Sequence, residues 1–257
     1  MLSPRSLAIA RTGTRLLLAD PAPLVVTIVM PLLLTAFLMP SARAQLRLTG
    51  FAGATGGEQL VPGLAVMFAF LNVALVGTLF FREHAWGTWD RLRASAASTA
   101  DIVLGKVLPL YACQLLQLGV LFAAGRLLFG YRPNGSVPAL AVVLALFVAM
   151  LVAFGIMLVA VFATMDQALV IGNLGGMVMA GLGGALAPAS TLPGWAQAVA
   201  HATPAYWALR ALHDITLDRA GLAEVAPALL VLAGFGAGFA LVAALRFRAG
   251  DVKVGTT

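Results

Sequence analysis

Six long stretches without a single charged residue dominate this sequence. They are Pro21–Ala42 with a core at Leu24–Met39, Val61–Phe81, Val107–Gly125, a segment within Val137–Met165, Gln167–Leu186 and Val225–Leu245. A helix that spans the hydrocarbon core of a membrane needs roughly 17–25 predominantly apolar residues. In lipid, a spanning segment must satisfy its own backbone polar groups, which favours α-helices. The sequence therefore predicts an all-α integral membrane protein with six transmembrane helices.

The composition supports a membrane protein and argues against a soluble one. Hydrophobic residues make up 61% of the chain and charged residues only 10%, whereas a soluble domain typically carries about 25% charged residues. The net charge of +6 comes from basic residues between the apolar runs. We therefore expect membrane lipids, and no nucleic acid, as partners of these charges. The single cysteine, Cys113, excludes an intramolecular disulfide.

The distribution of Lys and Arg predicts the orientation of the chain in the membrane. If the N-terminus is cytoplasmic, the inner segments hold ten basic residues: Arg5, Arg11, Arg15, Arg82, Arg91, Arg93, Lys106, Arg246, Arg248 and Lys253. The outer segments then hold six: Arg43, Arg47, Arg126, Arg132, Arg210 and Arg219. Cytoplasmic loops carry the excess of basic residues. We therefore expect a multi-pass protein of the cell (plasma or inner) membrane with both termini cytoplasmic.

Residues 1–19 are predicted to form an amphipathic helix at the membrane surface. Ser3 is a suitable N-cap and Pro4 suits the first helical position. At 100° per residue, Arg5, Arg11 and Arg15 fall within an arc of about 120°, and leucine and isoleucine fill the rest. A basic stripe opposite an apolar face is typical of an interfacial helix. The alternative is a tail that leads into the first crossing.

The loop after the second predicted crossing, residues 82–98, carries the most information. Trp86, Trp89, Leu92 and Ala96 recur every three or four residues and so share one face of a short helix. The pattern Ser98-x-x-Asp101 predicts a capping box at the start of the third membrane helix. Two interpretations remain open: an ordinary charged cytoplasmic loop, or a docking element for a soluble partner.

The order of residues in this loop resembles the signature of ABC-2 type permeases, the membrane subunits of a class of ATP-driven exporters. The matching residues are Glu83, Gly87, Thr88, Asp90, Arg91 and Leu92, with Ala96 where the family often has proline. Leu104-Gly105-Lys106, Leu192-Pro193-Gly194-Trp195 and Thr203-Pro204-Ala205-Tyr206-Trp207 also resemble the family. The resemblance covers essentially the whole chain.

The resemblance implies a specific architecture. Residues 1–257 would form a single ABC-2 type transmembrane domain, with an interfacial helix before six crossings. Two permease copies, here expected as a homodimer, would pair with two copies of a separate ATP-binding subunit. The loop 82–98, with its six matching residues, would dock into that ATPase. Residues 187–224 would form an extracytoplasmic re-entrant helical hairpin before the last crossing.

The chain contains no motif for chemistry of its own. Gly105-Lys106 is followed by Val107 and has no upstream glycine at the P-loop spacing, so no ATP site of that type exists. His-Glu-x-x-His and Gly-x-Ser-x-Gly are both absent. We therefore predict no catalytic residue, no metal site and no bound cofactor, with ATP and Mg on the partner subunit.

Polar and small residues within the apolar runs suggest two further sites. Asn72, Gln114, Gln117 and Asn173 either line a substrate path or form hydrogen bonds between helices. Gly172, Gly176, Ala180 and Gly184 recur at a spacing of four, which lets another helix approach closely. In the family the first and fifth helices build the dimer interface. Packing within one protomer is the alternative.

The predicted function is therefore that of the permease subunit of an ABC exporter for a hydrophobic or amphipathic substrate, drug-like or lipid-like. An exporter of polysaccharide or glycolipid is the first alternative. A secondary transporter or channel that works without an ATPase is less favoured, because ion-coupled transporters more often bury ionisable groups near the midplane. A membrane enzyme is the last alternative.

Overall fold

The chain folds as a bundle of α-helices, which confirms the predicted all-α class. The computed structural model describes residues 3–88, 94–95 and 97–246, without the side chains of residues 74–75 and 82–85. The helices are α1 (Pro4–Ala19), α2 (Ala22–Leu48), α3 (Gly57–Leu71), α4 (Val73–Ala85), α6 (Thr99–Phe129), α7 (Val137–Val161), α8 (Met165–Leu182), the 3₁₀ turn η1 (Ala189–Thr191), α9 (Gly194–Ala200), α10 (Pro204–Leu217) and α11 (Leu222–Arg246).

Two predicted helix starts are confirmed. The amide of Ser6 donates to Oγ of Ser3 at 3.1 Å, so Ser3 caps α1. At the start of α6 the amide of Asp101 donates to Oγ of Ser98 at 3.1 Å, and the amide of Ser98 donates to the Asp101 carboxylate at 3.0 Å. These bonds satisfy N–H groups that a helix leaves free in its first turn.

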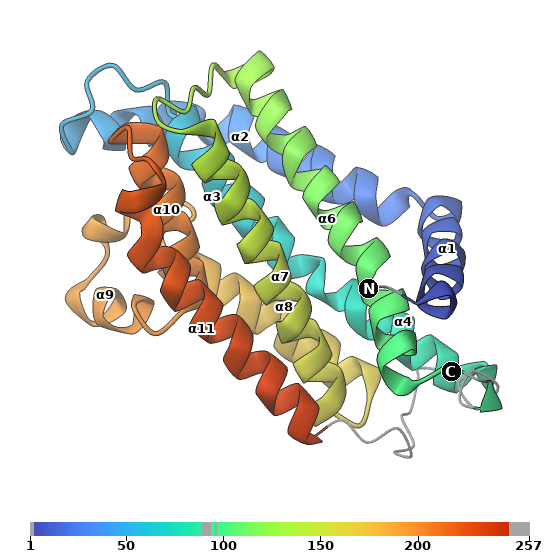
Figure 1. Cartoon of the computed structure of the whole chain (residues 1–257). Helices are drawn as coiled ribbons and strands as arrows, with labels where there is room; N and C mark the ends of the chain where they lie inside the picture. The colour runs from blue at the N-terminus through green and yellow to red at the C-terminus, as the bar shows by residue number, and fades with distance from the viewer. Residues whose placement is uncertain (1–2, 89–93, 96, 247–257) are drawn as a thin grey trace.

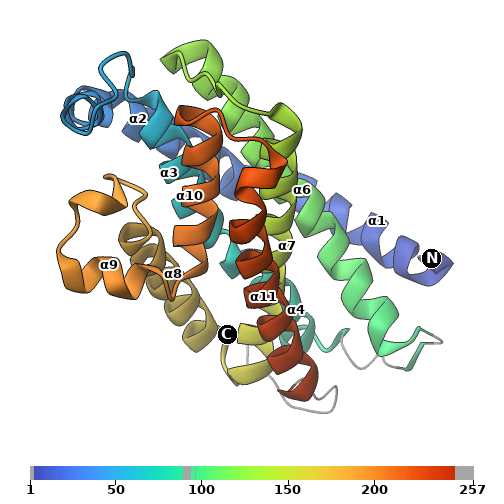
Figure 2. The same ribbon diagram turned by 60° about the vertical axis from the view of Figure 1, so that its left-hand side comes forward.

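The core of the bundle lies around α3 and α7. Phe70 of α3 is fully buried, and its ring packs edge-on against Phe147 and Phe154 of α7 at centroid distances of 5.8 and 6.3 Å. Figures 1 and 2 show α7 between α6 and α11, with α1 at one edge beside α6 and α9 at another. Buried side chains of α4, α6, α8, α10 and α11 also belong to this core.

Five helical segments among the described residues are long and apolar enough to cross a membrane. They are Ala22–Leu48, Gly57–Phe81, Thr99–Phe129, Val137–Val161 and Leu222–Arg246. Each corresponds to one of the six predicted crossings. The other prediction, Gln167–Leu186, corresponds to α8, which has 18 residues and includes Asp166, Gln167 and Asn173. These polar residues lower its hydropathy, and its length of about 27 Å falls just short of a hydrocarbon core of about 30 Å.

The chain nevertheless traverses the bundle between α7 and α11. The start of α7 and the end of α10 lie at the same end of the bundle, because the amide of Gly135 donates to the carbonyl of Ile215 at 2.9 Å. α7 then runs for 25 residues to the opposite end, where α8 begins. α8 and α10 in succession therefore return the chain to the end at which α11 starts (Figures 1 and 2).

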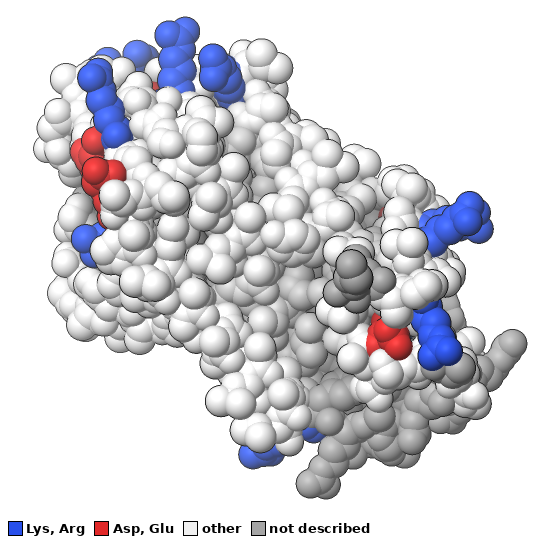
Figure 3. Space-filling model, in the orientation of Figure 1, with Lys and Arg blue, Asp and Glu red and all other residues white. Residues whose placement is uncertain are grey.

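Charged side chains on the face seen in Figure 3 gather at the two ends of the bundle and leave an uncharged band between them. The helix ends explain this distribution. Arg47 lies in the last turn of α2 and Arg126 in the last turn of α6, at one end. Asp101 in the first turn of α6 and Arg246 in the last turn of α11 lie at the other. An apolar band between two charged ends is the surface of a multi-pass membrane protein.

Candidate functional site

We call residues 82–98 the coupling segment, after their predicted role. The described residues of this segment lie at the end of the bundle where α4 stops and α6 begins (Figure 1). Glu83 belongs to the last turn of α4. Gly87 follows with φ of +66°, a left-handed conformation that favours glycine and commonly terminates a helix. The left-handed backbone at Gly87 thus ends α4 at a defined point.

The remaining motif residues are only partly described by the structure. Thr88 follows Gly87 directly and is half-buried, while the neighbouring Trp86 side chain is 65% exposed. Asp90, Arg91 and Leu92 lie outside the described residues. The coupling role of the six motif residues therefore stays a prediction.

The two helices that flank the coupling segment are tied to each other. Lys106 of α6 is 6% exposed, and its Nζ donates to the carbonyl of Leu79 in α4 at 3.4 Å. The same Nζ lies 5.8 Å from the centre of the Phe80 ring. The second half of α4 and the first turns of α6 are therefore held together close to the coupling segment.

Helix α1 is fastened to the start of α6. Oγ of Ser3 donates to Oδ1 of Asp101 at 2.5 Å, so one carboxylate serves both the α6 capping box and the α1 N-cap residue. The helices also approach closely at Gly105, where a Cβ atom would lie 2.8 Å from the carbonyl oxygen of Ser6 and 2.7 Å from Cβ of Ile9. A displacement of the first turns of α6 would therefore carry α1 with it.

Three of the four predicted mid-membrane polar residues form hydrogen bonds between elements of the bundle, Asn72 and Gln117 with each other and Gln114 separately. The Asn72 amide, between α3 and α4, donates to Oε1 of Gln117 in α6. Nε2 of Gln117 donates to the carbonyl of Thr27 in α2 at 3.1 Å, and Nε2 of Gln114 donates to the carbonyl of Ala69 in α3 at 2.8 Å. All three amide side chains are buried. Their geometry is that of a polar link between helices, and a role in a substrate path stays a prediction.

We expect Gln117→Leu to reduce the free energy of unfolding by about 1–3 kcal/mol, because it leaves the buried Asn72 amide without its acceptor. Asn173→Leu on α8 is the matched control. The buried Oδ1 of Asn173 accepts no hydrogen bond from any residue that the structure describes, so removing this side-chain amide should cost little stability. Thermal unfolding of both variants in detergent measures the difference. A Gln117→Leu protein that stays stable but transports differently would instead support the substrate path.

The small residues of α8 face the interior of this chain. A Cβ atom at Gly172 would lie 2.9 Å from Cδ1 of Leu158 in α7, and one at Gly176 would lie 2.7 Å from Cβ of Phe70 in α3. Ala180 is fully buried, and Gly184, with φ of +97°, turns the chain after α8. The stripe therefore packs helices within the protomer. A part for these four residues in a dimer interface stays a prediction.

The segment 187–224 contains the turn η1 and the helices α9 and α10 before α11 begins. Its position is fixed by the loop that precedes it: Nε2 of the buried Gln59 in α3 donates to the carbonyl of Gly184 at 2.7 Å. One turn further along α3, Gly63 leaves so little room that a Cβ there would lie 1.8 Å from the carbonyl oxygen of Ala185. Its re-entry into the bilayer stays a prediction.

Sequence reasoning missed the polar residues that close the opposite end of the bundle. Oε2 of the buried Glu58 accepts from the amide and the hydroxyl of Thr55, both at 2.9 Å. The spacing Thr55-x-x-Glu58 is that of a capping box and could have identified this pair. The Tyr131 hydroxyl lies 2.9 Å from Oγ1 of Thr216 and joins the loop after α6 to α10. Burial raises the pKa of Tyr131 to about 12, so its hydroxyl stays protonated.

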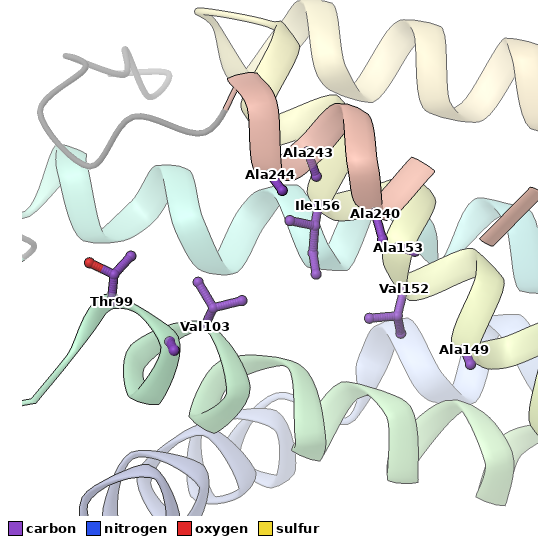
Figure 4. Close-up of a pocket in the computed structure, with 10 residues that line it drawn as sticks. Thr99, Val103, Ala149, Val152, Ala153, Ile156, Ala240, Ala243 and Ala244 are labelled. Atoms are coloured by element: carbon purple, nitrogen blue, oxygen red, sulfur yellow. The ribbon is translucent and has the colours of Figure 1, made fainter. Parts of the chain in front are cut away.

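An apolar pocket of about 370 Å³ opens between α6, α7 and α11, and we call it the apolar chamber (Figure 4). Its wall on α6 is formed by Thr99, Ala100 and Val103, which follow the coupling segment directly. Figure 4 shows the opposite side chains, from α7 and α11, across the gap. They are Ala149, Val152, Ala153, Ile156, Ala240, Ala243 and Ala244. Such a lining suits hydrocarbon and disfavours polar ligands.

The described residues contain no group of three or more His, Cys, Asp or Glu side chains that could hold a metal ion. The expectation of no metal or cofactor on this chain stays a prediction.

Comparison with known proteins yields a family and several relatives. The model of the ABC-2 type transporter family matches residues 7–217. The linearmycin resistance permease LnrN of Bacillus subtilis is 28% identical over 175 residues, which is 68% of this chain and 45% of the relative. The probable multidrug ABC transporter permease YbhR of Escherichia coli is 27% identical over 158 residues, or 61% of this chain and 42% of the relative. The chain spans less than half the length of these curated relatives.

Proposed function

Because the chain belongs to the ABC-2 type transporter family, we propose that it is the permease subunit of an ATP-driven exporter. The observation that carries the proposal is the family match over residues 7–217, which includes the coupling segment and most of the bundle. Members of this family are membrane components of transporters and in general work with an ABC ATP-binding subunit. In this proposal ATP binding by the partner moves the coupling segment, and two permease copies open a path outward.

The proposed topology has six crossings with both termini in the cytoplasm. The coupling segment must face the cytoplasm to meet an ATPase, and the N-terminus lies two crossings before it. The traverse through α8 and α10 supplies the remaining crossing, because it connects the end of α7 to the start of α11 at opposite ends of the bundle. In this proposal α8 forms the inner part of the fifth crossing, and α9 and α10 form the helical hairpin in the outer leaflet that completes it.

The proposed substrate is hydrophobic or amphipathic. Two observations support this class: the apolar chamber beside the coupling segment, and relatives whose names refer to linearmycin resistance and to multidrug transport. Polysaccharide export is the second candidate, and the low aromatic content of 8% disfavours it because sugar channels are commonly lined by aromatic rings.

The proposed second permease copy needs an apolar face to pack against. On α8 that face is the one opposite the small-residue stripe, where Val170, Ile171, Leu174 and Val178 are exposed. On α2 it carries Val26, Met30, Leu33 and Phe37, which are exposed as well. Exposed aliphatic side chains are also normal towards lipid, so these two faces are candidates for the homodimer interface.

Coexpression with the candidate ATP-binding subunit tests the proposed function. We expect the two chains to copurify and the permease to change the rate of ATP hydrolysis by its partner. Cells that express both proteins should accumulate less of an amphipathic dye than cells that lack them. Cells with an ATPase-inactive partner should show no such reduction. If the permease neither binds the subunit nor alters its hydrolysis, the assignment to an ATP-driven exporter is wrong.

A further inference from the structure

We propose that the apolar chamber binds the acyl chain of a single-chain amphiphile that enters from the leaflet on the side of the coupling segment. The inference deepens the proposed function, on which it rests, by naming the chemical class of the substrate and a place where it binds before export. It stands on three observations: the lining of the chamber, its position along the helices, and the charge beyond its end.

The lining selects hydrocarbon. Nine of the ten lining residues have aliphatic side chains, and six of those nine are alanines, whose small size leaves the space open. Among the described lining residues, Thr99 in the first turn of α6 has the only polar side chain. A polar ligand would lose its hydration without gaining hydrogen-bond partners. The volume of about 370 Å³ lies near the lower end of the range for small-molecule pockets, about 300–1,000 Å³. We therefore infer one acyl chain as the occupant rather than two.

The position of the chamber places the head of such a molecule at the membrane surface. The lining of α11 ends at Ala243 and Ala244, and Arg246 follows in the last turn, where it is exposed. On the other side Thr99 is the first residue of α6. We therefore infer that an acyl chain in the chamber has its head at the same end of the bundle as Arg246, whose positive charge favours an anionic group such as a carboxylate.

The α6 wall connects occupancy of the chamber to the coupling segment. Thr99 and Ala100 immediately follow Ser98, the last residue of that segment and the cap of α6. A movement of the coupling segment would therefore shift this wall relative to α7 and α11. Binding at two linked sites is reciprocal. An acyl chain that binds more tightly to one position of the α6 wall would therefore favour the matching position of the coupling segment.

Photo-crosslinking tests the site with purified permease alone. The probe is palmitic acid that carries a diazirine near its methyl end, added to vesicles of phosphatidylethanolamine and phosphatidylglycerol that contain the protein. We expect mass spectrometry to locate crosslinks within 99–103, 149–156 and 240–244. Ala240→Phe places a ring in the chamber, and because Ala240 is exposed the substitution meets open space. Labelling at these positions should fall about tenfold, the change expected when roughly two methylene groups lose their burial.

The control variant and a second probe make the outcome decisive. Ala233→Phe lies on the same face of α11, two turns away, and is exposed, so its labelling should equal that of the unaltered protein. Phosphatidylcholine with a diazirine in one of its two chains should label lipid-facing helices and spare the chamber. Equal labelling of the chamber by both probes, or undiminished labelling in Ala240→Phe, would overturn the proposal.

This experiment separates the inference from the proposed function. Crosslinking needs no ATPase. If palmitate labels the chamber but the protein does not bind the ATP-binding subunit, only the proposed function is contradicted. In the assembled complex, palmitate should raise ATP hydrolysis by the unaltered protein and by Ala233→Phe, and not by Ala240→Phe. Hydrolysis that responds equally in all three would show that the chamber is not a substrate site.

Discussion

Gly63→Ala is expected to destabilise the protein strongly, although it adds a single methyl group. The Cβ atom would lie 1.8 Å from the carbonyl oxygen and 2.7 Å from the carbonyl carbon of Ala185. Both are backbone atoms, and the loop that carries them is held in place one turn away by the bond from Gln59 to the carbonyl of Gly184. Overpacking at such a site typically costs about 1–3 kcal/mol and occasionally more.

Thermal unfolding and gel filtration in detergent measure this effect. Gly119→Ala is the matched control, because it makes the same change in α6 at a position where a Cβ atom would meet none of the described residues within 4 Å. Alanine has the higher helix propensity, so the control should be neutral or slightly stabilising. A Gly63→Ala protein as stable as Gly119→Ala would contradict the close approach of the loop 183–188 to α3.

The elements that the sequence predicts well are those set by local chemistry. A charge-free run of 20 residues must be a helix in lipid, so five predicted crossings match helices of the structure. Ser3 and Ser98 each accept a hydrogen bond from a backbone amide three residues later, so both caps depend only on local sequence, and both are found. α8 is less clear from the sequence. It is helical, as predicted, but Asp166 and Asn173 lower its hydropathy, so its hydropathy alone does not identify it as a crossing.

The relations that the sequence leaves open depend on which helices become neighbours. The stripe from Gly172 to Gly184 signals close packing but not its partner, and the structure supplies Leu158 and Phe70 of the same chain. Gln117 signals a hydrogen bond within the membrane, while its partners lie 45 and 90 residues away in sequence. The bond from Ser3 to Asp101 spans 98 residues and has no local signature. The apolar chamber, made of common aliphatic residues on three helices, could not have been read from the sequence.

Charge reversal in the coupling segment is expected to have the largest effect on function. Glu83 lies in the last turn of α4, at the end of the bundle that the proposed ATPase would meet. Loss of one partner of a buried charge pair at an interface costs about 2–5 kcal/mol, so in the proposed docking site Glu83→Lys should lower the affinity for the ATP-binding subunit at least about tenfold. A basic residue in the last turn suits the helix macrodipole, so α4 itself should not be weakened.

Two measurements distinguish this effect from a general loss of structure. The amount of Glu83→Lys protein in the membrane and its thermal stability should match those of the unaltered protein, while copurified ATPase and the permease-dependent change in hydrolysis fall. Asp166→Lys is the control, since Asp166 is an exposed acidic residue in the first turn of α8 at the same end of the bundle and outside the motif. Equal losses in both variants would indicate a non-specific electrostatic effect. If Glu83→Lys couples fully, Glu83 is not part of the docking site. The docking proposal would then rest only on the geometry of the segment, which is set by Gly87 and by the hydrogen bond from Lys106 to the carbonyl of Leu79.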